Sequence, residues 1–169
     1  MIFSKSGTST ARGRLWRAAL VCTAAAGALG LTGTTAMADT SVATFTLAQP
    51  DWQTGQSAGS NNELTGLYFQ ADGNLVLYGF DGEVDYPIWA SGTNGKGVTR
   101  LDWSKSGYVK LLDSSGRIVC TLGALSPAPG GHADVQNDGN FVFYDTDGHA
   151  TWSTGTYNHR RGNLNYCYT

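Results

Sequence analysis

Two nine-residue stretches, QADGNLVLY at Gln70–Tyr78 and QNDGNFVFY at Gln136–Tyr144, repeat one pattern of polar residues. Asp-Gly is a tight-turn signal, so we expect one strand to end at the Gln and the next to begin at the Asn. Side chains alternate between the faces of a strand, which puts Asn, Val and Tyr on one face and the two intervening apolar residues on the other. Each stretch therefore gathers a carboxylate, two carboxamides and a phenol around one apolar side chain.

A degenerate copy lies midway between the two stretches. SKSGYVKLL at Ser104–Leu112 keeps the Gly and the alternating apolar residues. Downstream, the outer copies run through an Asp-Gly turn to Trp89 or Trp152 and then Gly-Thr, while the middle copy has Cys120 in place of the Trp. Self-similarity at this spacing predicts three repeats packed around a common axis. We place them at about 61–93, 97–126 and 128–156, followed by a tail at 157–169.

The segments after residue 38 show no helical periodicity. Short alternating runs are separated by Gly, Asn, Asp and Ser, which is typical of an all-β domain built from hairpins. The predicted core contains inward-facing Leu75, Leu77, Val109, Leu111, Phe141 and Phe143, with Trp89 and Trp152 at its centre and Trp52 or Trp103 as a third ring. The predicted strands are Ala43–Leu47, Leu67–Gln70, Asn74–Tyr78, Ile88–Ala90, Arg100–Ser104, Tyr108–Leu112, Ile118–Leu122, His132–Gln136, Asn140–Tyr144 and Ala150–Ser153.

The first 38 residues have the pattern of a cleaved secretory signal. Four basic residues precede an Ala-, Leu- and Gly-rich run from Ala18 to Leu31 and a small-x-small site at Ala36-Met37-Ala38. The apolar run is shorter than the ~20 residues that a membrane-spanning helix needs. We therefore expect a secreted, extracellular protein that begins near Asp39, forms a single domain at 39–169 and has no membrane insertion.

Charge argues against nucleic acid as a partner. Loss of the leader removes four of the eleven Lys and Arg residues and none of the thirteen Asp and Glu residues. The remaining chain has seven basic and thirteen acidic groups, a net charge of −6. Binding to phosphate groups requires clustered cations, and the basic residues here are scattered.

Two cysteines remain after loss of the leader, Cys120 and Cys167. An exported protein with an even number of cysteines most simply pairs them, so we predict a disulfide. A metal site is the rival interpretation, and it fails because the His residues are widely spaced and no Cys or His lies at the short intervals of zinc sites. DTDG at Asp145–Gly148 resembles the start of a calcium loop without its later ligands, and we interpret it as a hairpin turn. No cofactor is expected.

The polar set of the repeated stretch matches the surface of a sugar. A pyranose presents hydroxyls that donate and accept, together with an apolar C–H patch. Asp accepts hydrogen bonds, Asn and Gln both donate and accept, Tyr does either, and Val contacts carbon atoms. Singly, each residue has an ordinary role in a hairpin. A turn requires neither the Gln two residues before the Asp nor the Tyr four residues after the Asn, so their joint recurrence favours binding.

The pattern Gln-x-Asp-x-Asn-x-Val-x-Tyr resembles the signature of the bulb-type (monocot, snowdrop-lectin-like) mannose-binding lectins, and it occurs twice without a departure. The resemblance covers about Ser41–Thr156. It implies a β-prism II fold, with three antiparallel sheets related by pseudo-threefold symmetry and a mannose pocket on each sheet. The basic, Ala- and Gly-rich leader looks like a bacterial export signal, so we expect a bacterial member.

The resemblance also implies roles for the carbohydrate-binding residues. The Gln would bond the sugar 3-hydroxyl, the Asp and Asn the axial 2-hydroxyl and the Tyr the 4-hydroxyl, while the Val would touch ring carbons. A site that buries partners for an axial 2-hydroxyl penalises glucose, which leaves them unpaired. The implied residues are Gln70, Asp72, Asn74, Val76 and Tyr78 in the first repeat, and Gln136, Asp138, Asn140, Val142 and Tyr144 in the third.

The middle repeat departs from the signature at every position, and we predict no mannose binding there. Two sites per chain would gain useful affinity for mannose-containing glycans or a cell-surface polysaccharide by engaging several sugars at once. The resemblance leaves a homodimer open. The tail at 162–169 would either support it by strand exchange or be held by the disulfide, which we favour. The motif positions of the middle repeat are occupied by Ser104, Ser106, Tyr108, Lys110 and Leu112.

Two other functions compete with sugar binding. A glycosidase would need a second carboxylate about 5–10 Å from Asp72 or Asp138, and identical motifs in separate repeats do not supply one. No Ser/His/Asp or Cys/His set is apparent, so we expect no enzyme. The alternative is a secreted protein-binding or bacteriocin-like inhibitory module on a lectin scaffold, and two intact motifs count against it. The longer loop at Asp81–Pro87 raises the question of whether the first site is obstructed.

Overall fold

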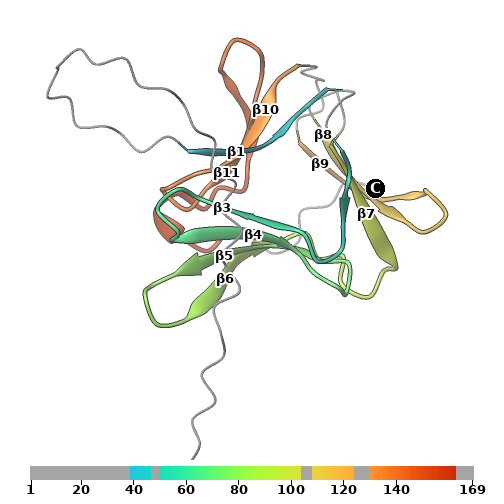
Figure 1. The fold of residues 1–169 in the computed structure, drawn as a ribbon, viewed down its shortest axis with the longest axis horizontal. Helices are drawn as coiled ribbons and strands as arrows, with labels where there is room; N and C mark the ends of the chain where they lie inside the picture. The colour runs from blue at the N-terminus through green and yellow to red at the C-terminus, as the bar shows by residue number, and fades with distance from the viewer. Residues whose placement is uncertain (1–38, 47–49, 104–107, 124–129, 163–169) are drawn as a thin grey trace, which may run out of the picture. The chain divides into compact units, whose positions relative to one another are not determined.

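The fold is built from short strands that follow one another along the chain (Figure 1). The computed structural model describes residues 39–46, 50–103, 108–123 and 130–162. The predicted signal segment, Ser104, Ser106 and Cys167 lie outside these ranges, so the leader and the disulfide remain predictions. In the described part, no helix is long and apolar enough to cross a membrane.

The secondary structure of the described ranges consists of twelve strands and one short 3₁₀ helix. In chain order they are β1 (Thr40–Thr44), β2 (Trp52–Gln53), β3 (Ser57–Gly59), β4 (Thr65–Phe69), β5 (Leu75–Phe80), β6 (Asp85–Ala90), β7 (Val98–Trp103), β8 (Tyr108–Asp113), β9 (Ile118–Gly123), β10 (His132–Val135), β11 (Phe141–Tyr144) and β12 (Ala150–Ser153). A short 3₁₀ helix, η1 (Tyr157–His159), follows β12.

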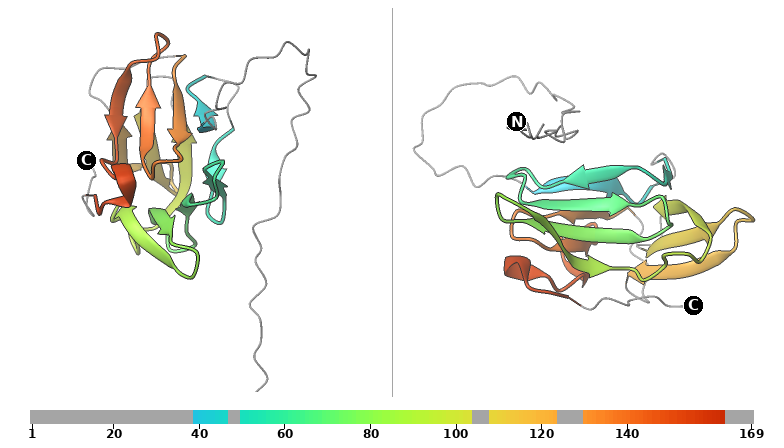
Figure 2. Two further views of the ribbon diagram at one scale, coloured as in Figure 1. Left: turned by 90° about the vertical axis from the view of Figure 1, so that its left-hand side faces the viewer. Right: turned by 90° about the horizontal axis from the view of Figure 1, so that it is seen from below.

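The strands form three antiparallel four-stranded sheets. Their orders are β3-β4-β5-β6 (the first sheet), β2-β7-β8-β9 (the second sheet) and β1-β10-β11-β12 (the third sheet). Three strands of each sheet are consecutive in the chain, and the N-terminal segment supplies the fourth strand to each sheet. Figure 1 looks along the axis around which the sheets are arranged, and Figure 2 shows the strands of the first sheet from the side. This is the predicted all-β, β-prism II architecture.

The apolar faces of the sheets point toward one another and form one core. Trp89 is buried, as predicted, because the chain near Gly162 runs beside it, with the Gly162 N–H donating to the Ile88 carbonyl (2.8 Å). The six residues predicted to face inward are all fully buried, which confirms that prediction: Leu75, Leu77, Val109, Leu111, Phe141 and Phe143.

The aromatic centre of the core differs from the prediction at Trp152. This ring is only partly buried, because β12 is the edge strand of the third sheet. It packs against Phe143, with ring centroids 4.6 Å apart. Trp52 and Trp103, the two candidates for a third ring, are both buried and meet edge to face at 5.1 Å.

Two of the three N-terminal strands, β2 and β3, were not predicted from the sequence, whereas β1 overlaps the predicted strand Ala43–Leu47. β2 has two residues and β3 has three, which is too short for an alternating pattern to be recognised. β2 exists because Trp52 and Gln53 pair with β7, and β3 because it pairs with β4. These strands are therefore defined by their partners rather than by their own residues.

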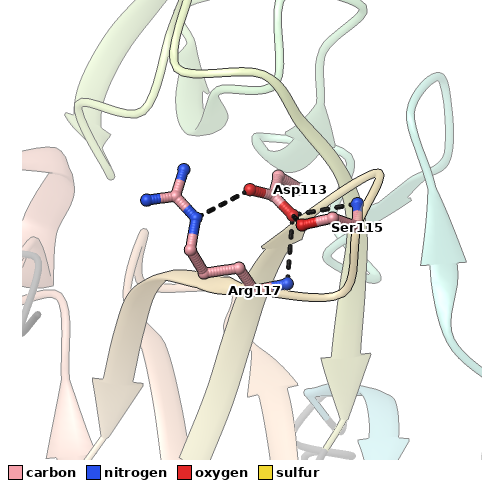
Figure 3. Close-up of polar contacts among 3 residues, drawn as sticks. All are labelled: Asp113, Ser115 and Arg117. Carbon is pink, nitrogen blue, oxygen red and sulfur yellow. Dashed lines mark hydrogen bonds and ion pairs between the residues drawn. The ribbon is translucent and has the colours of Figure 1, made fainter.

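An aspartate organises the turn of each long hairpin (Figure 3). Asp113 Oδ1 accepts hydrogen bonds from the backbone N–H groups of Ser115 (3.0 Å) and Arg117 (3.0 Å) and from the Ser115 hydroxyl (2.6 Å). Asp81 and Asp145 accept backbone N–H bonds in the same way in the other two sheets. The three residues follow one another at equal intervals along the chain, which reflects the internal repeat.

The DTDG segment forms a hairpin turn, as predicted. Asp145, Asp147 and His149 bring ligand atoms within 4.8 Å of one another. Asp145 Oδ1, however, accepts the backbone N–H bonds of Asp147 (2.9 Å) and His149 (2.8 Å), so the cluster is explained by the turn itself. The segment interpreted as a loop at Asp81–Pro87 is partly strand, because residues 85–87 belong to β6 and pair with the end of β5.

Replacement of Asp113 by Asn should lower stability at neutral pH by an amount that shrinks in acid. The Ser115 hydroxyl, followed by the Arg117 backbone N–H, lowers the pKa of Asp113 from 3.8 to about 2. A carboxyl whose folded-state pKa lies below its unfolded value stabilises the fold above the unfolded value, and this contribution is lost as the pH falls toward about 2. Urea unfolding of both proteins from pH 7 to pH 2 measures the difference, and a difference independent of pH would contradict the assignment.

Candidate functional site

The structure brings the five motif residues of each outer repeat together on the outer face of a hairpin. The first-sheet site lies on β4–β5, and the third-sheet site lies on β10–β11. In both, Asn and Tyr are partly exposed, while the two residues that alternate with them on the inner face are buried in the core. The first-sheet site consists of Gln70, Asp72, Asn74, Val76 and Tyr78; the third-sheet site consists of Gln136, Asp138, Asn140, Val142 and Tyr144.

A tight turn joins the two strands of each site, as the Asp-Gly pair predicts. In the first sheet, the Gln70 N–H donates to the Asn74 carbonyl (2.8 Å) and the Gly73 N–H donates to the Gln70 carbonyl (3.0 Å). Gly73 has a φ of 83° and Gly139 a φ of 92°, in the left-handed region that favours glycine. A Cβ on Gly73 would also lie 2.6 Å from the Val98 carbonyl oxygen. The turn therefore requires glycine for both conformation and space.

The aspartate of each site is fixed by its own turn. One carboxylate oxygen of Asp72 accepts the Asn74 N–H at 3.0 Å, and Asp138 does the same with Asn140 at 3.0 Å. Asp72 is exposed and Asp138 is partly buried. Each carboxylate keeps a second oxygen that can accept a hydrogen bond from a ligand.

The asparagine of each site is held from outside the motif. Asn74 Oδ1 accepts bonds from the Ser91 hydroxyl (3.0 Å) and the Thr93 N–H (3.1 Å). Asn140 Oδ1 accepts the equivalent bonds from Thr154 (3.0 Å) and Thr156 (3.1 Å). With the oxygen occupied, the asparagine presents its amide nitrogen as a donor. The prediction that Asn both donates and accepts is therefore corrected to a donor alone.

The residues that hold the asparagine were not predicted from the sequence. They belong to a Ser/Thr-Gly-Thr segment after β6 and after β12, which we call the clip: Ser91–Thr93 in the first sheet and Thr154–Thr156 in the third. The last threonine of each clip also donates to the carbonyl of the turn glycine, at 2.7 Å in both sheets. The recurring Gly-Thr after the Trp was the available signal. A role could not be assigned to it without the hydrogen bonds.

The glutamine and tyrosine of each site are joined across the hairpin. Gln70 Nε2 donates to the Tyr78 hydroxyl (2.9 Å), and Gln136 Nε2 donates to the Tyr144 hydroxyl (2.5 Å). Because each hydroxyl accepts from the glutamine, its own hydrogen is directed elsewhere, and the glutamine oxygen remains an acceptor. Burial raises the pKa of Tyr144, so this phenol keeps its hydrogen at neutral pH.

The valine of each site is more deeply buried than its predicted role suggests. Val76 is 3% exposed and Val142 is 4% exposed, although both lie on the same strand face as the asparagine and tyrosine. The strands beside them account for this, because Val76 has Tyr68 and Ala90 as its direct cross-strand neighbours. Each valine therefore offers a ligand only a small apolar surface at the floor of the site.

The second sheet lacks this arrangement in its described residues. Lys110 lies at the valine position, and Leu112, at the tyrosine position, is 6% exposed. Cys120 pairs with Leu111 as Trp89 pairs with Leu77, so the buried Leu122 takes the place of the clip serine. These described residues of the second sheet provide neither the motif nor the clip, and the absence of mannose binding there stays a prediction. Ser104 and Ser106 and the side chain of Tyr108 are not described.

Three sheets around an axis, with one polar motif on the outer face of two of them, define the β-prism II fold. No protein-family model matches the chain. It is 30% identical over 113 residues to the B-type lectin plumieribetin of Scorpaena plumieri, a match that covers 67% of this chain and 65% of that protein. The chain thus spans just under two thirds of the length of this relative.

Solved structures show the same likeness. A Marasmius oreades lectin covers 65% of this chain and 88% of its own with a TM-score of 0.55 and 22% identity, which shows the fold. Monocot mannose-binding lectins from Gastrodia elata have 30% identity, cover 63% of this chain and 97% of their own, and give a TM-score of 0.47. The chain therefore has the fold of the Marasmius oreades lectin and resembles a B-type lectin in sequence. The proteins that it resembles are lectins rather than enzymes, as predicted for this chain.

Replacement of Thr156 by Val should destabilise the protein, although the two side chains have nearly the same shape. The buried Thr156 hydroxyl donates to the Gly139 carbonyl (2.7 Å) and bonds the Thr154 hydroxyl (2.7 Å), and its loss removes both bonds and leaves the Gly139 carbonyl without this donor. An unsatisfied buried polar group costs about 1–3 kcal/mol. Urea unfolding measures the loss, and the same change at exposed Thr99 is the control. Equal effects at both positions would contradict the role of the clip.

Proposed function

We propose that this protein is a secreted lectin that binds α-mannose-containing glycans through the first-sheet and third-sheet sites. The observation that carries the proposal is the fixed polar set of each site. Asp supplies an acceptor and Asn a donor. The Gln–Tyr pair supplies a further acceptor, the Gln oxygen, and a further donor, the Tyr hydroxyl. Its presence in two sheets with the same hydrogen bonds favours a binding role over a structural one.

The polar set matches the needs of a sugar hydroxyl. A hydroxyl both donates and accepts, so it can donate to the free carboxylate oxygen of the Asp and accept from the Asn amide. Because the clip holds the asparagine, this pair is oriented before the sugar arrives, which lowers the entropy cost of binding. A sugar whose 2-hydroxyl points away from the pair leaves both partners unpaired, which is the physical basis for preferring mannose to glucose.

The proposal implies a glycan-bearing surface as the partner, export from the cell and a gain from dimerisation. Two sites on different sheets of one chain suit a surface that displays many mannose residues, such as a glycan coat or a cell-surface polysaccharide. Export by the predicted signal would bring the protein to such surfaces. A homodimer would double the number of sites. Relatives named as B-type and mannose-binding lectins support the proposal.

The proposal is tested by replacing the two site aspartates and measuring binding of each variant to a mannan-coated surface. Asp72→Asn and Asp138→Asn each replace a charged acceptor by a weaker one, and removal of a hydrogen bond to a charged group costs about 1.5–3 kcal/mol, or roughly ten- to a hundredfold in affinity at that site. Each single variant should bind the surface more weakly because it loses bivalent attachment. The double variant should lose binding.

Asp147→Asn is the matched control, since Asp147 is an exposed aspartate of a hairpin turn outside both sites. It should bind mannan as the wild type does. Wild-type binding that persists in the folded double variant would exclude the proposed sites. Absence of wild-type binding to mannan, with retained binding to protein targets, would favour the protein-binding alternative.

A further inference from the structure

The first-sheet and third-sheet sites share five residues but differ in the strand that lies beside them. In the first sheet, β4 places Tyr68 opposite Val76 and Gly66 opposite Tyr78. In the third sheet, β10 places Asp134 opposite Val142 and His132 opposite Tyr144. Directly opposite residues on one sheet face have Cβ atoms about 5 Å apart, so these neighbours border the sites.

An aromatic ring borders the first-sheet site. Tyr68 is partly buried and meets Tyr78 edge to face, with ring centroids 5.5 Å apart and an interplanar angle of 89°. Gly66 carries no side chain over Tyr78 on this face. Burial raises the pKa of Tyr68 to about 12, so the ring is neutral at physiological pH. The border of this site is therefore aromatic.

A histidine and an aspartate border the third-sheet site. The His132 ring stacks on Tyr144, with centroids 5.1 Å apart and an interplanar angle of 19°, so it covers one face of the site tyrosine. His132 Nε2 lies 3.4 Å from a carboxylate oxygen of Asp134. The same motif is thus bordered by an imidazole and a carboxylate instead of a phenol ring.

We propose that Tyr68 extends the first-sheet site into a two-part site, in which the aromatic ring binds the apolar face of the group linked to the mannose. This inference rests on the proposed function and adds a second subsite to it. The motif residues serve one pyranose, whereas Tyr68 adds an aromatic surface at their border. Such a surface suits a flat apolar group, either an aromatic aglycone or the C–H face of a second sugar. The third-sheet site lacks this subsite.

NMR titrations of the whole protein compare the two sites within one molecule. The probes are methyl α-mannoside, phenyl α-mannoside and an α-linked mannobiose, and the amides of Asn74 and Asn140 report the two sites separately. An aromatic contact is expected to tighten binding about three- to tenfold. Phenyl α-mannoside should therefore bind more tightly than methyl α-mannoside at Asn74 and equally well, within about twofold, at Asn140.

Two variants of Tyr68 assign the gain to the ring. Tyr68→Ala should remove it, and Tyr68→Phe, which keeps the ring and its edge-to-face contact with Tyr78, should keep it. Mannobiose shows whether a second sugar obtains the same gain as the aryl group or whether the subsite accepts the aryl group alone. A gain for both ligands and a gain for phenyl α-mannoside alone each support the subsite. The first result means that it accepts a second sugar, and the second means that it accepts only an aromatic aglycone.

Three results would overturn the inference. They are equal gains at the two sites, a gain that survives Tyr68→Ala, and no gain for either extended ligand at Asn74. The wild-type comparison needs no substitution, so it stands even if the Ala variant fails to fold. The methyl α-mannoside titration separates this inference from the proposed function. If neither site responds to that ligand, the proposed function itself fails.

Discussion

The hydrogen bonds between the site asparagine and its clip are the interaction on which both sites depend. Asn74 and Asn140 are the first residues after their turns, and the clip ties each one to the end of the third strand of the same meander. The clip also binds the carbonyl of the turn glycine. One set of bonds therefore closes the meander and fixes the orientation of the amide that would meet a sugar. Stability and binding geometry are coupled through these few atoms.

The turns also connect the sheets to one another. Gly73 lies against Val98 at the start of the second sheet, and the carbonyl of Asp72 accepts the Gly95 N–H at 3.0 Å. In the third sheet, Asn137 accepts two hydrogen bonds from Asn62, which precedes the first-sheet strand β4. The turn that carries the motif is thus supported by neighbouring sheets as well as by its own clip. A binding residue on such a turn is held in place before a ligand arrives.

The repeats made much of this structure predictable from sequence. Alternation around the motif identified the central hairpins and their inward residues, because sheets buried on one face impose a period of two. The edge strands β2 and β3 were missed because their partners define them. Trp152 was misplaced because burial on an edge strand depends on what covers it: Trp89 on β6 lies beside the chain near Gly162, whereas Trp152 on β12 is only partly buried. The clip was missed because its serine and threonines act through hydrogen bonds to a distant strand of the same meander. A short Ser/Thr-Gly-Thr pattern does not by itself indicate such a role.

The most direct measurement of the central claim is an NMR titration of the wild-type protein that follows the side-chain amides of Asn74 and Asn140. Methyl α-mannoside is the ligand, and methyl α-glucoside is the control that differs at the 2-hydroxyl. Our account predicts that both side-chain amides shift with the mannoside and that neither shifts with the glucoside. If both amides stay unchanged at millimolar mannoside, or respond equally to the two sugars, the clipped asparagine is not a mannose-binding group.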